Sequence, residues 1–116
     1  MGMRVEEQGT TLLLRLMGEF DQACVGRVEA ALERVSAAHT TRVVFDLQGL
    51  SFLDSGGLMT ILRANERART EPFEVAVVRP QGLVSRLFTL TRAGEQLTIL
   101  DHIPTTTAWP GLATAT

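Results

Sequence analysis

Asp54 and Ser55 are the residues whose types and position best suit them to chemistry, because they stand where an apolar run ends and a helical pattern begins. Residues 42–47 are nearly all apolar, as in a central strand that is covered on both faces. Apolar residues resume after Ser55 at spacings of three and four, which predicts a helix. Either residue can cap this helix with a side-chain oxygen, so Ser55 is a structural cap or a hydroxyl open to modification.

Two glycines, Gly56 and Gly57, follow Ser55 at once. Glycine costs up to about 1 kcal/mol relative to alanine within a helix, so a pair in the first turn needs a reason. We expect that another surface approaches the backbone closely at this point.

A phosphate on Ser55 would lie at a helix N-terminus, where free N–H groups and the helix dipole favour an anion. The fold should tolerate the group. It would add about −1.5 to −2 charges beside the preceding carboxylate and near Asp21, and a docked partner would feel that charge. A phosphate on Ser55 would therefore act as a switch on any partner docked here, and Leu58, Met59 and Arg63, which follow Ser55 on the helix, would widen the docking surface.

Residues 46–58, which read DLQGLSFLDSGGL, resemble the signature of STAS-domain proteins, specifically the bacterial anti-sigma factor antagonists. Upstream, Gly18-Glu19-Phe20-Asp21 resembles the second landmark of that family, a Gly-Glu-hydrophobic-Asp box between an early strand and the first helix. The resemblance covers roughly residues 3–100. In the family, the serine that matches Ser55 is phosphorylated by the anti-sigma factor, which is itself a serine kinase.

The resemblance implies a binding module and not an enzyme. The unphosphorylated chain would bind the anti-sigma factor and free a sigma factor, and phosphorylation of Ser55 would release the complex until a serine phosphatase reset it. ATP and Mg²⁺ would be held by the kinase, so this chain needs no cofactor. The resemblance, together with position next to Ser55 on the helix for the last three, gives these predicted partner-binding residues: Asp21, Asp54, Ser55, Gly56, Gly57, Leu58, Met59 and Arg63.

Asp21 has an alternative structural role, and Gly56 departs from the family pattern. Asp21 can equally be a helix N-cap with no further role. Gly56 stands where the family often has a second hydroxyl residue, which leaves Ser55 as the only acceptor in this segment.

Residues 54–57 also match part of the nucleophile segment of trypsin-like serine proteases. That family has Gly before the Asp and Pro after the second Gly, where this chain has Leu53 and Leu58, and it is a much longer double β-barrel. A catalytic triad also needs a base within hydrogen-bond reach. His39 and His102 are expected to be ordinary surface residues, so we predict no catalytic residue.

A non-enzymatic alternative is an accessory subunit of a lipid-transport ATPase or a stress-signalling scaffold. STAS modules occur in both settings, and the fold alone does not separate these uses. The partner that co-purifies with the chain would distinguish them.

The composition limits the other classes of function. The 116 residues carry 11 basic and 13 acidic side chains, a balance that argues against nucleic acid as a partner. Two distant histidines and the lone Cys24 offer no metal-ligand cluster and no internal disulfide. Apolar runs fall short of the roughly 18 residues of a membrane span, and no signal pattern is evident. The lone cysteine favours a cytoplasmic protein. A monomer is our separate expectation, which the sequence itself does not determine.

The elements that must position these residues follow from the apolar pattern. Strands are expected at residues 3–6, 11–17, 42–47, 73–78 and 97–100. Residues 52 and 53 should turn inward after a break at residues 48–49. Helices are expected after Asp21, from Asp54 or Ser55, and from Pro80 to a point before Gly94. The first helix should bury Val25, Val28, Leu32 and Val35, and the third Leu83, Val84, Leu87 and Phe88. Arg63, Glu66 and Arg67 should form a solvated face.

Strands that alternate with helices after an opening hairpin predict an α/β fold. We expect a single STAS-like domain over residues 1–116, with a core of about 3–100 and a weakly structured tail at 104–116. Its mixed, mostly parallel sheet should have about five strands with three to four helices. Functional loops of such sheets gather at the carboxyl ends of the strands. Asp21 and Ser55 each follow a strand, so they should share one site.

Overall fold

One five-stranded sheet organises the part of the chain that this computed structural model describes, residues 1–37 and 39–104. In spatial order its strands are β1 (Gly2–Gln8), β2 (Thr11–Phe20), β3 (Arg42–Leu53), β4 (Glu74–Val78) and β5 (Thr98–Leu100). β1 and β2 form an antiparallel hairpin, and each later pair is parallel. The prediction of a mixed, mostly parallel sheet is confirmed, with β3 at its centre. The expected tail from residue 105 onward lies outside the described residues.

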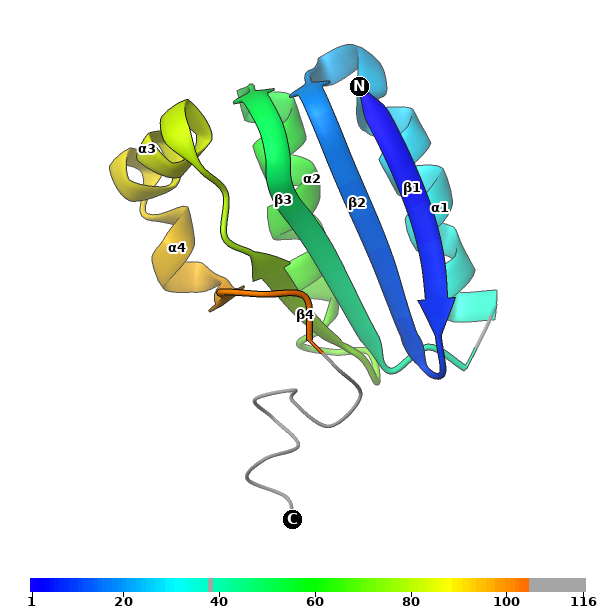
Figure 1. The fold of residues 1–116 in the computed structure, drawn as a ribbon. Coiled ribbons are helices and arrows are strands. Elements are labelled where there is room, and N and C mark those ends of the chain that lie inside the picture. The colour runs from blue at the N-terminus through cyan, green and yellow to red at the C-terminus, as the bar shows by residue number, and fades with distance from the viewer. Residues whose placement is uncertain (38, 105–116) are drawn as a thin grey trace.

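The helices follow the strands they help to bury. α1 (Val25–Ala37), preceded by the short 3-10 helix η1 (Gln22–Cys24), and α2 (Ser55–Arg67) lie on one face of the sheet (Figure 1). α3 (Gly82–Thr91) and α4 (Ala93–Gln96) lie beyond β3, on the side of the sheet away from β1 (Figure 1). No helix in the described ranges is both long enough and apolar enough to span a bilayer.

A single large apolar cluster fills the space between the sheet and the helices. Its fully buried members include Phe20, Val28, Phe45, Leu47 and Ile61. A smaller cluster lies on the opposite face of the sheet, and it contains Leu13, Val44, Ala76, Val78 and Leu100. The central strand is therefore buried on both faces, which explains why its residues 43–47 are consecutively apolar apart from Asp46.

β3 is six residues longer than the apolar run predicts, and it continues to Leu53. Relative to β2, it gains one extra residue between Asp46 and Gly49 and another between Leu50 and Phe52. Such bulges reset which way the following side chains point. Leu47, Leu50 and Leu53 are all buried although they are spaced by three, a spacing that a regular strand would send to alternate faces.

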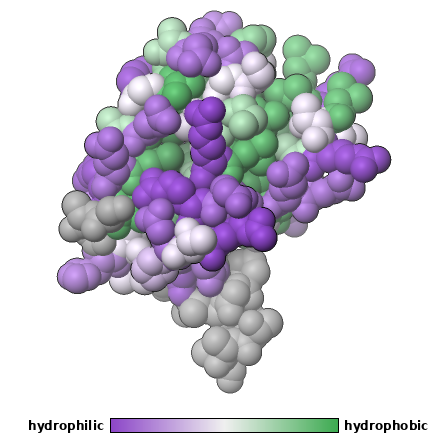
Figure 2. Space-filling model, turned by 180° about the vertical axis from the view of Figure 1, so that it is seen from behind, coloured by the Kyte–Doolittle hydropathy of each residue, from purple (hydrophilic) through white to green (hydrophobic). Residues whose placement is uncertain are grey.

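The expected burial of α3 is partly wrong. The helix begins at Gly82, two residues after Pro80, and it buries Val84 and Phe88 as predicted. Leu83, however, is 72% exposed, as is Leu90 at 77%. Apolar side chains gather at the edge of the molecule where α3 lies (Figure 2). The helix has two apolar stripes, and only contact with the sheet decides which one is buried.

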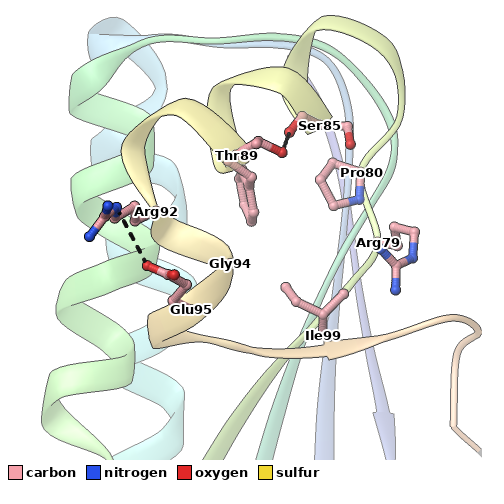
Figure 3. A pocket seen from close by; sticks show the side chains of 9 residues that line it. Arg79, Pro80, Ser85, Thr89, Arg92, Gly94, Glu95 and Ile99 are labelled. Carbon is pink, nitrogen blue, oxygen red and sulfur yellow. Dashed lines mark hydrogen bonds and ion pairs between the residues drawn. The ribbon is translucent and has the colours of Figure 1, made fainter.

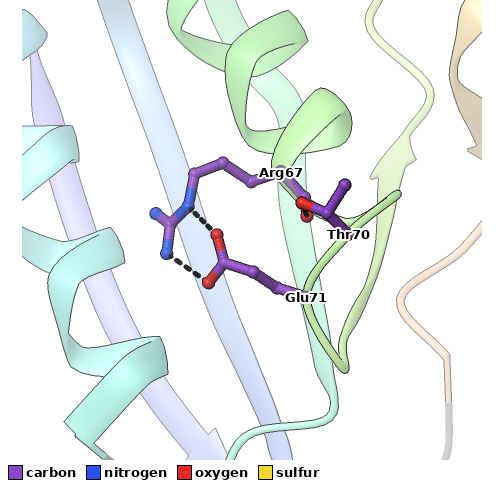
Figure 4. A network of polar contacts seen from close by, with 3 residues as sticks. All are labelled: Arg67, Thr70 and Glu71. Atoms are coloured by element: carbon purple, nitrogen blue, oxygen red, sulfur yellow. Dashed lines mark hydrogen bonds and ion pairs between the residues drawn. The ribbon is translucent and has the colours of Figure 1, made fainter.

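Arg67, near the end of α2, holds the loop that leads into β4 (Figure 4). Its Nε and Nη2 donate to the two carboxylate oxygens of Glu71 at 2.8 and 3.1 Å, and its guanidinium lies 5.5 Å from the ring centroid of Phe73. Bidentate pairing and cation–π contact both add specificity. The prediction of a solvated face is confirmed for Arg63 and Glu66, which are exposed, and holds only in part for Arg67, whose side chain is 35% exposed and pairs with Glu71.

This pair predicts a dependence of stability on pH. The hydrogen bond from Arg67 lowers the pKa of Glu71 below its ordinary value of 4.5. The Arg67–Glu71 pair therefore contributes fully to the free energy of unfolding above about pH 4.5. This contribution is lost as the pH falls through the lowered pKa of Glu71 in the folded chain. We expect Glu71→Gln to flatten the decline of the free energy of unfolding in acid, measured by urea denaturation from about pH 7 to pH 3.

Glu66→Gln is the matched control for this prediction. Glu66 lies on α2, next to Arg67. Its ion pair with Arg69 spans 3.5 Å, and both side chains are more than 70% exposed. Such exposed pairs contribute little. An equal change of the acid slope in both variants would contradict a specific role of the Arg67–Glu71 pair.

Candidate functional site

The two sequence landmarks meet through one carboxylate. Asp54 Oδ1 accepts the N–H of Gly57 at 2.8 Å and so caps α2, while Asp54 Oδ2 accepts the N–H of Gln22 at 2.9 Å. The N–H of Asp54 in turn donates to Phe20 O at 3.2 Å. The end of β2, the start of η1 and the start of α2 are thereby fixed to one another. The expectation of a shared edge at the carboxyl ends of β2 and β3 is confirmed.

Asp54, and not Ser55, is the N-cap of α2, which decides between the two possibilities. Asp21 is also a cap, because its side chain accepts the N–H of Ala23 at 3.1 Å at the start of η1. Its half-buried carboxylate has a structural role in the hairpin-to-helix turn. Its expected contact with a partner stays a prediction.

The chain's own packing requires Gly57 and leaves little room at Gly56. A Cβ at position 57 would lie 2.7 Å from Leu53 Cδ1 and 2.8 Å from Phe20 O, distances that real Cβ atoms do not show. A Cβ at position 56 would collide with the carboxamide oxygen Oε1 of Gln22. The expected close approach is confirmed, and the approaching surface is the end of β2 with the following turn.

Ser55 is the first residue of α2, and its side chain is exposed. The capping bonds of Asp54 use the N–H of Gly57, and the N–H of Leu58 donates to Asp54 O at 3.0 Å. The N–H groups of Ser55 and Gly56 take no part in these bonds. They would be free to meet an anion carried by the Ser55 side chain.

The surface around Ser55 differs from the predicted one. Met59, one turn further along α2, is 44% exposed, and Arg63 is exposed one turn beyond it. Leu58 packs in the core and is therefore absent from this surface, as is Gly57.

Phe52, three residues before Ser55 in the sequence, is also exposed, at 47%. The expectation that both Phe52 and Leu53 turn inward is wrong for Phe52. Neighbouring strand residues point to opposite faces, and this alternation was the signal that could have placed it.

No triad forms with His39. His39 precedes β3 and Ser55 follows it, so the twelve-residue strand separates them, at about 3.3 Å per residue. His102 is exposed after β5. Among the described residues, no group of three or more His, Cys, Asp or Glu side chains could hold a metal ion.

Removing the shared carboxylate should loosen this edge of the sheet. We expect Asp54→Ala to lower the free energy of unfolding by about 1–2 kcal/mol, since an N-cap is lost. Asp54→Asn keeps one carbonyl oxygen for Gly57 N–H, so its loss should be smaller. Urea denaturation measures both. Amide hydrogen exchange should quicken at Gly57 and Gln22 in the alanine variant, and unchanged exchange at both would contradict the bridge.

Comparison with known proteins places these features in context. A model of the STAS domain matches residues 2–106. An anti-sigma F factor antagonist of Lysinibacillus sphaericus is 26% identical over 85 residues, which are 72% of this chain and 73% of that protein.

Two solved structures share the fold. The anti-sigma factor antagonist SpoIIAA in its unphosphorylated form superimposes with a TM-score of 0.75, at 20% identity over 87% of this chain and 90% of the other. The Bacillus cell fate determinant SpoIIAA in its phosphorylated form gives a TM-score of 0.69, at 19% identity over 87% and 93%. At such low identity these structures establish the common fold.

Proposed function

The chain belongs to the STAS domain family, and from this we propose that it is an anti-sigma factor antagonist controlled by phosphorylation of Ser55. The unphosphorylated form binds an anti-sigma factor that is also a serine kinase, which frees a sigma factor. Phosphorylation of Ser55 ends that binding, and a serine phosphatase restores it. The observation that carries this proposal is the exposed Ser55 side chain beside the Asp54 cap at the start of α2, with Met59 exposed one turn further along the same helix.

The docking surface combines apolar anchors with a neutral hydroxyl. Phe52 and Met59 flank Ser55 in the sequence and are each nearly half exposed. Large apolar side chains of this kind supply most of the binding energy of an interface when a partner covers them. Arg63 at the end of this stretch can pair with an acidic group of the partner. The proposed surface is therefore Phe52, Ser55, Met59 and Arg63, with Asp54 fixing its geometry.

Phosphorylation changes this surface by charge alone. The carboxylate of Asp54 is held in place by two backbone N–H groups, so it cannot turn away from a phosphate on the next residue. The added charge of about −1.5 to −2 then faces a partner that has docked on an uncharged hydroxyl. The N–H groups of Ser55 and Gly56 can stabilise the same phosphate within the folded chain. We therefore expect a large effect on binding and a small one on stability.

Affinity purification tests the identity of the partner. The full chain with unmodified Ser55 is expected to retain a serine kinase that also binds a sigma factor. Phe52→Ser should weaken this retention, whereas Leu83→Ser, which changes an exposed leucine on α3, is the control for loss of surface apolarity. Recovery of a transporter ATPase in place of the kinase would contradict the proposal and favour an accessory-subunit role.

A further inference from the structure

A cavity of about 340 Å³ lies between α3, α4 and the ends of β4 and β5 (Figure 3). Its lining residues fall within 79–99, so it shares none of them with the surface around Ser55. Pro80, Phe88 and Ile99 form its apolar wall, and the side chain of Ile99 points into it (Figure 3). Pockets for small ligands usually measure about 300–1,000 Å³ and have mostly apolar walls with a few polar groups. This cavity fits a small ligand with an apolar body.

Two arginines stand on opposite sides of the cavity, and they differ in availability (Figure 3). Arg79 is engaged by Asp101, whose Oδ1 lies 3.1 Å from Nε and 3.0 Å from Nη2. Among residues 1–37 and 39–104, the Arg92 guanidinium pairs only with Glu95, with its Nε 3.9 Å from the carboxylate, and both side chains are more than two thirds exposed. An exposed ion pair of this length contributes almost nothing, so Arg92 can exchange partners at little cost.

The acidic residues beside the two arginines limit which kind of anion the cavity can bind. Glu95 and Asp101 lie beside the two arginines, and their charges would repel a dianionic phosphate more than a singly charged group. A carboxylate would take the place of Glu95 on Arg92, with the planar geometry that guanidinium groups prefer. The hydroxyl groups of Ser85 and Thr89, which also line the cavity, can add polar contacts.

We propose that this cavity binds a small organic carboxylate with an apolar ring or branched chain. Its apolar part lies against Phe88, Ile99 and Pro80, and its carboxylate pairs with Arg92. The site shares none of the residues proposed for partner docking.

The test is an NMR titration of the full chain with 4-isopropylbenzoate, using the uncharged 4-isopropylbenzamide as the matched ligand. The expected result is a set of saturable backbone amide shifts within residues 79–99, with a Kd of about 1 mM or lower for the acid. The amide should bind at least about tenfold more weakly. Absence of saturable shifts up to about 10 mM acid, or shifts centred elsewhere, would overturn the proposal.

Variants assign the roles within the cavity. Arg92→Gln should weaken binding of the acid about tenfold while leaving binding of the amide unchanged. Arg86→Gln is the charge-matched control, since Arg86 is exposed on α3 and does not line the cavity. Ile99→Trp should fill the cavity and abolish binding of both ligands. If Ile99→Trp does not fold, the Arg92→Gln comparison decides alone, and unchanged affinity for the acid would refute the assignment.

Discussion

Phosphorylation of Ser55 is expected to weaken the complex with the anti-sigma factor at least about 100-fold, which corresponds to about 2.7 kcal/mol. The loss lies within the roughly 2–5 kcal/mol seen when an interfacial charge is left without its partner. Its cause is the placement of a second anion beside Asp54, whose two oxygens are both held by backbone N–H groups. Isothermal titration of the partner with the chain before and after complete phosphorylation measures the change.

Substitutions separate modification from binding. Ser55→Ala should bind the partner with nearly unchanged affinity and should gain no phosphoryl group in intact-mass measurements after incubation with kinase and ATP. Ser51→Ala is the matched control, because Ser51 is an exposed serine on β3 whose hydroxyl donates to Gly18 O at 3.2 Å. It should be phosphorylated like the unaltered chain. Equal affinity of the modified and unmodified forms would exclude the switch.

Gly57→Ala is expected to destabilise the fold by about 1–3 kcal/mol, as overpacking of a well-filled core does. The new methyl group would be forced against Phe20 O and Leu53 Cδ1, and the backbone oxygen cannot move without disturbing β2. In a domain of this size the melting temperature should fall by roughly 4 °C for each kcal/mol. Thermal and urea unfolding followed by circular dichroism measure both quantities.

Two other glycines calibrate this effect. Gly26 lies in α1, and a methyl group added there would meet nothing within 4 Å, so Gly26→Ala should leave stability unchanged or raise it by up to about 1 kcal/mol. Gly56→Ala should fall between the two, because the exposed side chain of Gln22 can swing aside. If Gly57→Ala were as stable as Gly26→Ala, the close approach of β2 to α2 would not be a constraint.

Local chemistry was enough to predict the types of the elements and the edge where they converge. Apolar runs at periods of two and of three to four residues placed the hairpin, the central strand and the helix after it. Side-chain oxygens before those helices indicated caps. Because parallel strands end at one edge of a sheet, these features also predicted that Asp21 and Ser55 would share a site.

Contacts between distant segments decided the remainder. Asp54 became the cap and also bound Gln22 because η1 lies next to the start of α2, and no local pattern carries that information. Pairing with β2 carried β3 on to Leu53, and two bulges in that pairing reset its register, so that Leu47, Leu50 and Leu53 are all buried. The sheet selected which apolar stripe of α3 is buried, leaving Leu83 in solvent.

The sequence by itself thus determined the kinds of elements, the position of the Ser55 hydroxyl and the edge of the sheet at which it stands, since each depends on residues close together in the chain. Only the tertiary structure decided that this hydroxyl is exposed, which side chains surround it, and that a separate cavity lies behind α3. Exposure and cavities depend on which surfaces of distant segments remain uncovered after packing, and packing is a property of the whole domain.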